Sequence, residues 1–326
     1  MRAIRITRPG GPEVLQLADI ETPVPGPGQI RVRVAATAIN RADLAQIAGR
    51  YRAPPGFPQD LPGMEYAGLV DALGKGVERW TEGDAVMGII GGAGWAEYVV
   101  VNEGEAIAVP APLSLEQAAA IPEVFMTAHD AIITQLNLSS GETLLVHGAG
   151  SGVGTAAIQI GASVGATVWG TARSTWKLER AKALGLSLGI DSTTASFDDV
   201  VLRASDGRGV DVILDLVGGN HLAANVNAIA KRGRIIIVGV VAGPKAELDM
   251  RALMGKRALI RGTVLRARPL DEKIDVARAF ESFAAERFAS GALRPIIDRT
   301  LPIERIAEGL EAVRANETYG KVVLTL

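Results

Sequence analysis

The feature that most constrains the fold is a glycine-rich turn inside a long uncharged stretch, LLVHGAGSGVGTAAIQIGASVGATVWGTA, at residues 144–172. Glycine stands at positions 148, 150, 152 and 154, and no formal charge lies between Glu142 and Arg173. The absence of charge over this length would be compatible with a transmembrane helix. However, His147 and several Ser, Thr and Gln side chains dilute the apolar surface, and the glycines disfavour helix nucleation. The pattern instead predicts a strand over 143–147, a helix over 152–164 and a second strand over 166–171.

Strand, glycine turn, helix and strand form half of a βαβ unit of the kind that binds a dinucleotide. Glycines there permit a tight turn and the close approach of a pyrophosphate, whose charge is stabilised by free N–H groups at the helix N-terminus. The strict G-x-G-x-x-G spacing fails, because Val153 or Thr155 occupies its third position. A ligand-free turn that packs a helix onto a sheet therefore stays open. A G-x-S-x-G nucleophile elbow is excluded, because Ala149 and Val153 flank Ser151.

Composition limits the classes of function. The 326 residues are enough for two domains, and 48% hydrophobic with 21% charged residues is typical of a soluble enzyme. Lys plus Arg number 34 and Asp plus Glu number 36, so no basic field recruits nucleic acid or a membrane surface. The chain has no cysteine, which excludes disulfides and thiolate catalysis. The N-terminus lacks the apolar core of a secretory signal, so we expect a cytoplasmic protein.

Two regions of different pattern follow one another along the chain. Residues 1 to about 110 predict short strands, such as 29–39 and 95–101, separated by Pro and Gly clusters. Residues 114–117 form an S-x-x-Q capping box that predicts a helix start. From Thr143 onward strands and helices alternate, which predicts a doubly wound parallel sheet and hence the α/β class. Further on, Val276, Phe280 and Phe283 share one helical face and are expected in the core.

The segment after the second strand bears on which nucleotide binds. An NAD site has an acidic residue there, which binds both ribose hydroxyls. Residues 171–177, TARSTWK, contain no carboxylate and offer Arg173, Ser174 and Lys177 to a 2′-phosphate. This pattern favours NADPH over NADH. The alternative is that Arg173 and Lys177 are ordinary solvated residues at a helix start.

Six segments together carry a resemblance to a known family: PGGPEVL (9–15), NRADLAQIAGRYRAPPG (40–56), AAAIPEVFMTA (118–128), SGVGTAAIQ (151–159), DVILDLVGG (211–219) and GKVVL (320–324). With them the chain resembles the medium-chain dehydrogenase/reductase superfamily and, within it, the zeta-crystallin-like, zinc-free quinone oxidoreductases. The resemblance implies a GroES-like β-rich catalytic domain of residues 1–122 and 267–326. A Rossmann NADPH-binding domain of residues 123–266 would be inserted between them, with the active site in the intervening cleft.

The positions that match the zinc ligands of metal-dependent relatives are Asn40, Met64 and Glu123. An amide, a thioether and one carboxylate do not form the usual zinc tetrahedron, and the three histidines show no ligand spacing, so we expect no metal. Without a Lewis acid, alcohol oxidation is difficult. A quinone or conjugated carbonyl can accept hydride with hydrogen-bond donors alone. The expected reaction is therefore reduction of such a small-molecule acceptor by NADPH.

The resemblance also implies roles for individual residues. Asn40 and Tyr51 would be the catalytic hydrogen-bond donors at the acceptor oxygen, although Tyr51 could equally brace its loop. A tyrosine common in the family is replaced by Ser192, which leaves part of the expected NADPH pocket in doubt. Gly218 and Asn316 could instead be simple turn residues. The expected cofactor-binding residues are Thr127, Gly150, Ser151, Gly152, Val153, Arg173, Ser174, Lys177, Ser192, Gly218, Gly239, Leu265, Asn316 and Lys321.

Two other functions stay open at this stage. An enoyl-thioester or enone reductase uses the same hydride chemistry with a tyrosine proton donor, and Arg50 with Arg52 could attract a phosphate-bearing carrier. A non-catalytic NADPH-binding protein would bind the cofactor without turnover. The resemblance further implies a homodimer, formed through the exposed edge of the apolar strand predicted at 258–264.

Overall fold

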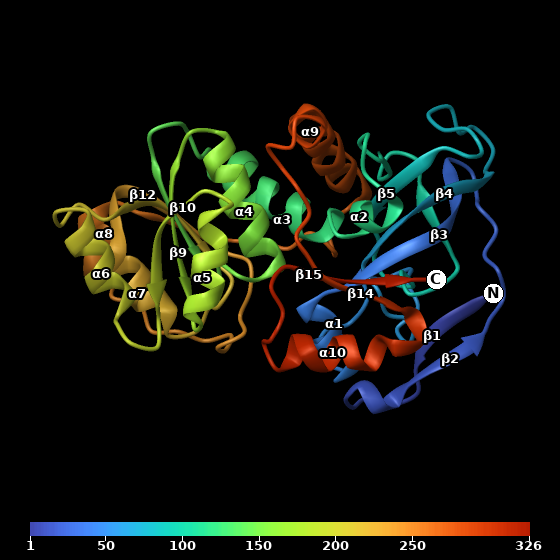
Figure 1. The fold of residues 1–326 in the computed structure, drawn as a ribbon, viewed down its shortest axis with the longest axis horizontal. Coiled ribbons are helices and arrows are strands. Elements are labelled where there is room, and N and C mark those ends of the chain that lie inside the picture. The colour runs from blue at the N-terminus through green and yellow to red at the C-terminus, as the bar shows by residue number, and fades with distance from the viewer. The chain divides into compact units, whose positions relative to one another are not determined.

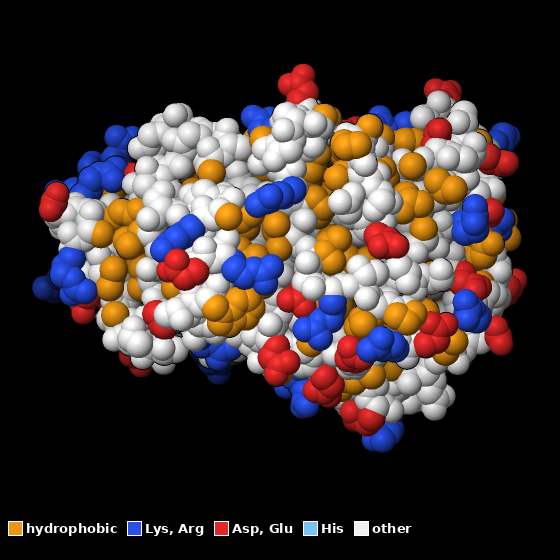
Figure 2. All heavy atoms as spheres, in the orientation of Figure 1, with side chains coloured by type: hydrophobic (Ala, Val, Ile, Leu, Met, Phe, Trp, Pro, Cys, Tyr) orange, Lys and Arg blue, Asp and Glu red, His pale blue; other side chains and the backbone are white.

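The computed structural model describes residues 1–326 and divides them into two compact units. Unit 1 contains Met1–Met126 and Leu265–Leu326, and unit 2 contains Thr127–Val264. No helix in either unit combines the length and the apolar character that crossing a membrane requires. Lys and Arg side chains are interspersed with Asp and Glu over the face seen in Figure 2.

Unit 1 is built on a seven-stranded sheet with the order β14-β15-β3-β4-β5-β7, and β6 also pairs with β3. All pairings are antiparallel except β14 with β15. The strands are β3 (Gln29–Ile39), β4 (Glu65–Leu73), β5 (Ala85–Ile89), β6 (Tyr98–Asn102), β7 (Ile107–Ala108), β14 (Ile297–Pro302) and β15 (Lys321–Thr325), with β1 (Arg2–Ile6) and β2 (Leu15–Asp19) in a separate ribbon.

The helical segments of unit 1 are η1 (Pro12–Val14), α1 (Arg41–Ile47), α2 (Leu115–Ala119), the π-helical η2 (Pro122–Met126), α9 (Leu270–Ala289), η4 (Ile303–Arg305) and α10 (Ile306–Arg314). The predicted capping box at the start of α2 is confirmed, because Ser114 Oγ accepts from Gln117 N at 3.2 Å and Gln117 Oε1 accepts from Ser114 N at 3.0 Å.

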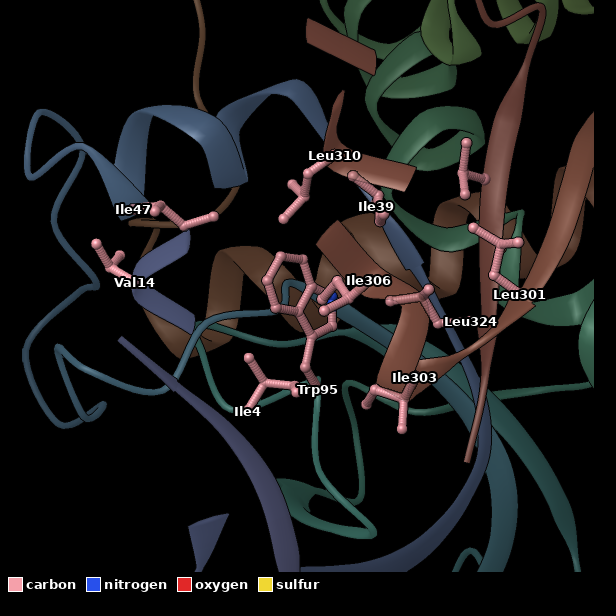
Figure 3. Close-up of a cluster of buried hydrophobic side chains, with 11 residues drawn as sticks. Ile4, Val14, Ile39, Ile47, Trp95, Leu301, Ile303, Ile306, Leu310 and Leu324 are labelled. Carbon is pink, nitrogen blue, oxygen red and sulfur yellow. The ribbon is translucent and has the colours of Figure 1, made fainter. Parts of the chain in front are cut away.

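One hydrophobic cluster joins the two chain segments of unit 1. The fully buried indole of Trp95 packs in one cluster with Ile4 of β1, Ile306 and Leu310 of α10 and Leu324 of β15 (Figure 3). An indole buries a large apolar area, so this contact stabilises the association of residues that are hundreds of positions apart. The C-terminal strand and helix are therefore integral parts of the N-terminal fold.

The apolar face predicted for α9 is correct at two of its three positions. Val276 and Phe280 are buried, but Phe283 is only partly so, and the Arg287 guanidinium lies 3.9 Å from the centre of its ring. Ala284 and Phe288 complete the buried face instead. The reason is the 3.6-residue period: the buried positions 276, 280, 284 and 288 are centred between 280 and 284, and position 283 lies at the edge of that face, beside 276.

Unit 2 contains a six-stranded parallel sheet with the order β10-β9-β8-β11-β12-β13, flanked by helices on both sides (Figure 1). The predicted α/β class with a doubly wound parallel sheet is confirmed. The uncharged stretch forms β8 (Thr143–His147), α4 (Gly152–Ser163) and β9 (Thr167–Ala172). Chain order reverses between β8 and β11, and such switch points are where doubly wound sheets bind ligands.

The remaining strands of unit 2 are β10 (Leu186–Asp191), β11 (Val210–Asp215), β12 (Ile229–Ile237) and β13 (Leu259–Gly262). Its other helical segments are α3 (Thr127–His129), the π-helical η3 (Asp130–Gln135), α5 (Thr175–Lys182), α6 (Phe197–Ala204), α7 (His221–Ala228) and α8 (Met250–Lys256).

Candidate active site

The glycine turn of unit 2 leaves no room for side chains. Gly148 has φ +72°, a conformation that other residues rarely adopt. A Cβ on Gly154 would lie 2.1 Å from the Gly148 carbonyl oxygen, and a Cβ on Gly150 would lie 2.6 Å from Lys177 Cδ. The turn is therefore packed between the start of α4 and the aliphatic stem of Lys177, which accounts for the glycines at these positions.

The start of α4 presents backbone donors beside this turn. Ser151 is the N-cap, and its Oγ accepts from Gly154 N at 3.0 Å. Gly152 and Val153 are the first two helical residues, so their N–H groups have no acceptor within the helix. Free N–H groups at the positive end of a helix dipole suit a pyrophosphate. The residues expected to hold a dinucleotide therefore fit one.

The carboxyl end of β9 carries the residues expected at the 2′-phosphate. Arg173 is exposed, and Ser174 is the N-cap of α5 with no side-chain capping bond. Ser192 lies beside them, because its Oγ donates to Ala172 O at 3.3 Å. Lys177 is buried, and its Nζ is 5.4 Å from the centre of the Trp176 ring. Arg173, Ser174 and Ser192 are thus brought together at one strand end.

A buried network holds the loop after β11. Asp215 accepts from Val217 N at 2.7 Å, from Gly218 N at 2.9 Å and from Asn225 Nδ2 at 2.9 Å. Asn225 Oδ1 then hydrogen-bonds His147 Nε2 at 2.7 Å. Burial lowers the pKa of His147 to about 4, so its imidazole is neutral at physiological pH. The network fixes the backbone at Gly218.

The other expected cofactor residues are spread along the chain. Gly239 follows β12, where a Cβ would lie 2.6 Å from the Leu216 carbonyl oxygen. Thr127 is the buried first residue of α3, and Leu265 lines a small pocket in unit 1. Asn316 has φ +61°, and its Oδ1 accepts from Arg41 Nη2 at 3.5 Å.

Unit 1 contains a group of buried or partly buried polar and charged residues that we call the polar cluster: Asn40, Asp43, Tyr51, Glu65, Glu123, Arg266 and Lys321. Its centre is an ion pair of 2.7 Å between Lys321 Nζ and Glu65 Oε1, whose side chains are 4% and 0% exposed. Lys321 Nζ also donates to Asn40 Oδ1 at 2.6 Å and to Ile39 O at 2.9 Å. All three N–H groups of this ammonium are therefore used inside unit 1.

Asn40 and Asp43 belong to the start of α1. Asn40 Nδ2 donates to Glu65 Oε1 at 2.7 Å, and Asn40 N donates to Asp43 Oδ2 at 2.7 Å. Asp43 Oδ1 is buried without a hydrogen-bond partner. Burial raises the pKa of Asp43 to about 7, because the bond from Asn40 N and the charges of Lys321 and Arg266 offset only part of the free energy of desolvating the carboxylate.

Glu123 lies in the π-helical segment η2, a geometry often found at functional sites. Its backbone N donates to Glu65 Oε2 at 2.9 Å, whereas its own Oε2 is buried and has no partner. Burial and then the charge of Glu65 raise the pKa of Glu123 to about 8. The Glu123 carboxyl is therefore mostly protonated at neutral pH.

Arg266 and Tyr51 form the remaining side of the polar cluster. Arg266 donates to Gly91 O at 2.9 Å and to Gln46 Oε1 at 2.6 Å, and its Nη1 has no partner. Its guanidinium lies 5.0 Å from the centre of the Tyr51 ring. Burial, followed by the charge of Glu123, raises the pKa of the Tyr51 hydroxyl, which stays protonated and able to donate.

Sequence reasoning missed three members of this cluster: Asp43, Glu65 and Arg266. Asp43 had a local signal, because Asn40 and Asp43 form a capping box at the start of α1. Glu65 and Arg266 had no local sequence signal. They only stand next to Met64 and Leu265, which the family resemblance singled out. No group of three or more His, Cys, Asp or Glu side chains is arranged to hold a metal ion.

Two family models match the chain, and the second runs from unit 2 into α9 of unit 1. Residues 26–111 match the family described as alcohol dehydrogenase GroES-like domain, and residues 152–282 match that described as zinc-binding dehydrogenase. The quinone oxidoreductase of Lama guanicoe is 33% identical, over 100% of this chain and 98% of that protein.

Solved structures share the fold over nearly the whole chain. The apo structure of JamJ enoyl reductase has a TM-score of 0.89 and 26% identity, over 99% of this chain and 98% of that one. A mycobacterial protein complexed with NADPH has a TM-score of 0.88 and 26% identity, over 100% of both chains.

A GroES-like sheet unit combined with a parallel-sheet unit of this strand order is the architecture of a medium-chain dehydrogenase/reductase. Within that superfamily the chain belongs to the quinone oxidoreductase family, at 33% identity over its full length, and it is an oxidoreductase.

Proposed function

We propose that this protein reduces a quinone or a similar conjugated carbonyl with NADPH, and that it does so without a metal ion. The observation that carries the proposal is the Lys321 ammonium, which already pairs with Glu65 and Asn40 in the buried centre of the polar cluster. A metal bound to those oxygens would have to compete with a cation built into the fold. A conjugated acceptor spreads the charge that it receives and does not need a Lewis acid.

When bound, NADPH would supply a hydride. The residues of unit 2 would bind it, with the N–H groups of Gly152 and Val153 at the pyrophosphate and Arg173 at the 2′-phosphate. Similarity to a protein complexed with NADPH supports this choice of nucleotide. In unit 1 the Tyr51 hydroxyl would donate a hydrogen bond to the acceptor oxygen, held in place by the Arg266 guanidinium beside its ring.

The test is anaerobic oxidation of NADPH with a benzoquinone, a naphthoquinone, an enone and an enoyl thioester, repeated with NADH and with a chelator. The proposal expects turnover of the quinones that prefers NADPH and is unaffected by the chelator. The similarity to an enoyl reductase supports a second candidate, reduction of an enoyl thioester or enone. Turnover confined to the thioester would establish that candidate. NADPH binding with no turnover would instead identify a non-catalytic protein.

We also propose a homodimer formed through the edge of the parallel sheet. Strand β13 ends the sheet order, and Leu259 on it is exposed. In the same unit Met250 and Met254 of α8 are 70% and 74% exposed. A sheet edge without a partner strand, in a unit that also exposes methionines, is suited to pairing with a second copy. Sedimentation at a monomer mass that does not change with concentration would contradict a dimer.

A further inference from the structure

We propose that Arg266 is the positioning residue of Tyr51, and that its buried positive charge stabilises the negative charge that forms on Tyr51 when the acceptor takes up a proton. The inference rests on the proposed function, in which the Tyr51 hydroxyl contacts the acceptor oxygen. It names the residue that supplies a cation to a site proposed to work without a metal ion.

Arg266 is a buried cation whose hydrogen-bond partners are both neutral. The residue is 3% exposed. Its Nε donates to the Gly91 carbonyl oxygen at 2.9 Å, and its Nη2 donates to the side-chain amide oxygen of Gln46 at 2.6 Å. No carboxylate accepts either bond, and Nη1 is buried without a partner. A buried charge is costly unless it is compensated, so this guanidinium is suited to an anion that forms only during the reaction.

The aromatic ring beside this cation is that of Tyr51. The guanidinium carbon lies 5.0 Å from the ring centre, within the distance at which a cation is attracted to an aromatic ring. A tyrosinate spreads its negative charge over the oxygen and the ring, so the attraction increases as the hydroxyl gives up its proton. Burial, followed by the charge of Glu123, raises the pKa of Tyr51, whereas the charge of Arg266 lowers it. Arg266 therefore favours the form of Tyr51 that has lost its proton.

Arg266 also fixes the loop that carries Tyr51. Gln46 near the end of α1 is 5% exposed, accepts from Arg266, and donates through Nε2 to Gln59 O at 3.4 Å. The Gln59 side chain closes the loop, because its Oε1 accepts from Ala53 N at 3.1 Å and its Nε2 donates to Ala53 O at 3.0 Å. Tyr51 lies between Gln46 and Ala53 in the chain. These bonds therefore hold its backbone on both sides while the guanidinium lies against its ring.

The proton transfer that these contacts serve is part of the reduction. The acceptor receives a hydride from NADPH, and its oxygen takes the Tyr51 proton. The O–H bond of Tyr51 breaks, a new O–H bond forms on the acceptor, and a tyrosinate is left beside the Arg266 guanidinium. Tyr51 is partly exposed, so the tyrosinate regains a proton from water. Together the hydride and one proton convert a quinone into a hydroquinone.

Two pairs of variants separate the charge of Arg266 from its hydrogen bonds. Arg266→Met removes the charge and keeps much of the apolar stem, whereas Arg266→Lys keeps the charge and loses the fork that bonds two oxygens at once. Gln46→Glu places a carboxylate against the guanidinium and neutralises it. Its matched control, Gln46→Met, removes the same bond to Gln59 without adding a charge. The exposed control is Arg305→Met.

Each protein is assayed for quinone reduction by NADPH and titrated by NMR with ¹³C-labelled tyrosine. The chain has 4 tyrosines, and Tyr51→Phe identifies which signal belongs to Tyr51. The other ionisable groups that influence Tyr51 or stand next to it in the chain are retained in every variant: Asp43, Glu123, Arg50 and Arg52.

Arg266→Met should raise the pKa of Tyr51 and lower kcat by about a hundredfold, with an unchanged Kd for NADPH. Arg266→Lys should leave the pKa of Tyr51 close to that of the wild type and restore part of kcat. Gln46→Glu should raise the pKa of Tyr51 more than Gln46→Met does, and Arg305→Met should behave like the wild type. A purely structural role of Arg266 would lower stability without moving the Tyr51 titration.

An unchanged Tyr51 titration in Arg266→Met, or a kcat equal to that of the wild type, would overturn the inference. If Arg266→Met does not fold, the two Gln46 variants decide, and Tyr51 titrating at the same pH in both would overturn it. A wild type that turns over no acceptor would refute the proposed function itself, and the Tyr51 titration would still test the contact with Arg266.

Discussion

Replacing Lys321 with methionine should destabilise unit 1 far more than loss of a surface ion pair. Methionine keeps most of the volume of the lysine stem but removes the ammonium 2.7 Å from Glu65 Oε1. Glu65 is then a buried carboxylate held only by Asn40 Nδ2 and Glu123 N. Removing one partner of a buried pair costs about 3–5 kcal/mol, because the other charge is left unpaired.

The control is Arg305→Met, which breaks an ion pair with Glu308 whose side chains are 58% and 46% exposed. Exposed ion pairs contribute roughly 0–1 kcal/mol, so the free energy of unfolding of this variant should be nearly that of the wild type. The double variant Glu65→Gln with Lys321→Met removes both charges and should recover about 1–4 kcal/mol relative to Lys321→Met alone.

The assay is urea unfolding followed by both tryptophan fluorescence and circular dichroism, since two units can unfold in separate steps. Trp95 reports on unit 1 from the middle of its core. If Lys321→Met costs no more than Arg305→Met, or if the double variant is less stable than the single one, the reasoning about the buried pair is wrong.

Three further predictions concern other parts of the molecule. Arg173→Ala should weaken NADPH binding by about tenfold or more and leave NADH binding nearly unchanged in fluorescence titrations, whereas equal losses would remove Arg173 from the 2′-phosphate site. Gly154→Ala should lower stability by about 1–3 kcal/mol because its Cβ would meet the Gly148 carbonyl; Gly255→Ala, in an open helical position of α8, should raise it slightly. Glu123 has its pKa raised from 4.5 to about 8 in the folded protein, so the native state keeps a proton that the unfolded chain loses. The free energy of unfolding should therefore fall by up to about 4 kcal/mol between pH 5 and pH 8, and Glu123→Gln should show a smaller fall in pH-dependent melting.

Elements specified by local sequence were predicted accurately. The strands at 143–147 and 29–39 have the predicted bounds, and α4 ends one residue before the prediction. Short-range rules are sufficient there, because strand alternation, glycine turns and capping boxes depend on residues only a few positions apart. The strand predicted at 95–101 was less accurate. It begins at Tyr98, because Trp95 is drawn into the hydrophobic core instead.

The polar cluster could be predicted only in part. Asn40, Tyr51 and Lys321 were expected near a substrate or cofactor on family resemblance, and Glu123 was considered only as the position of a lost metal ligand. Their assignment to substrate and cofactor stays a prediction. That Lys321 neutralises Glu65 could not be foreseen, because 256 residues separate them and an isolated Glu or Lys in a sequence is normally exposed.

The sequence by itself determined the two kinds of architecture, the glycine turn with its free helix N-terminus, and the absence of a carboxylate after β9. Each of these follows from residue type and short-range spacing. Only the tertiary structure decided which charged residues are buried together and which of them is left without a partner. The physical reason is that the cost of ionising a carboxyl depends on burial and on the groups around it, and here those groups come from the start of α1, from β4, β15 and η2, and from the segment after β13.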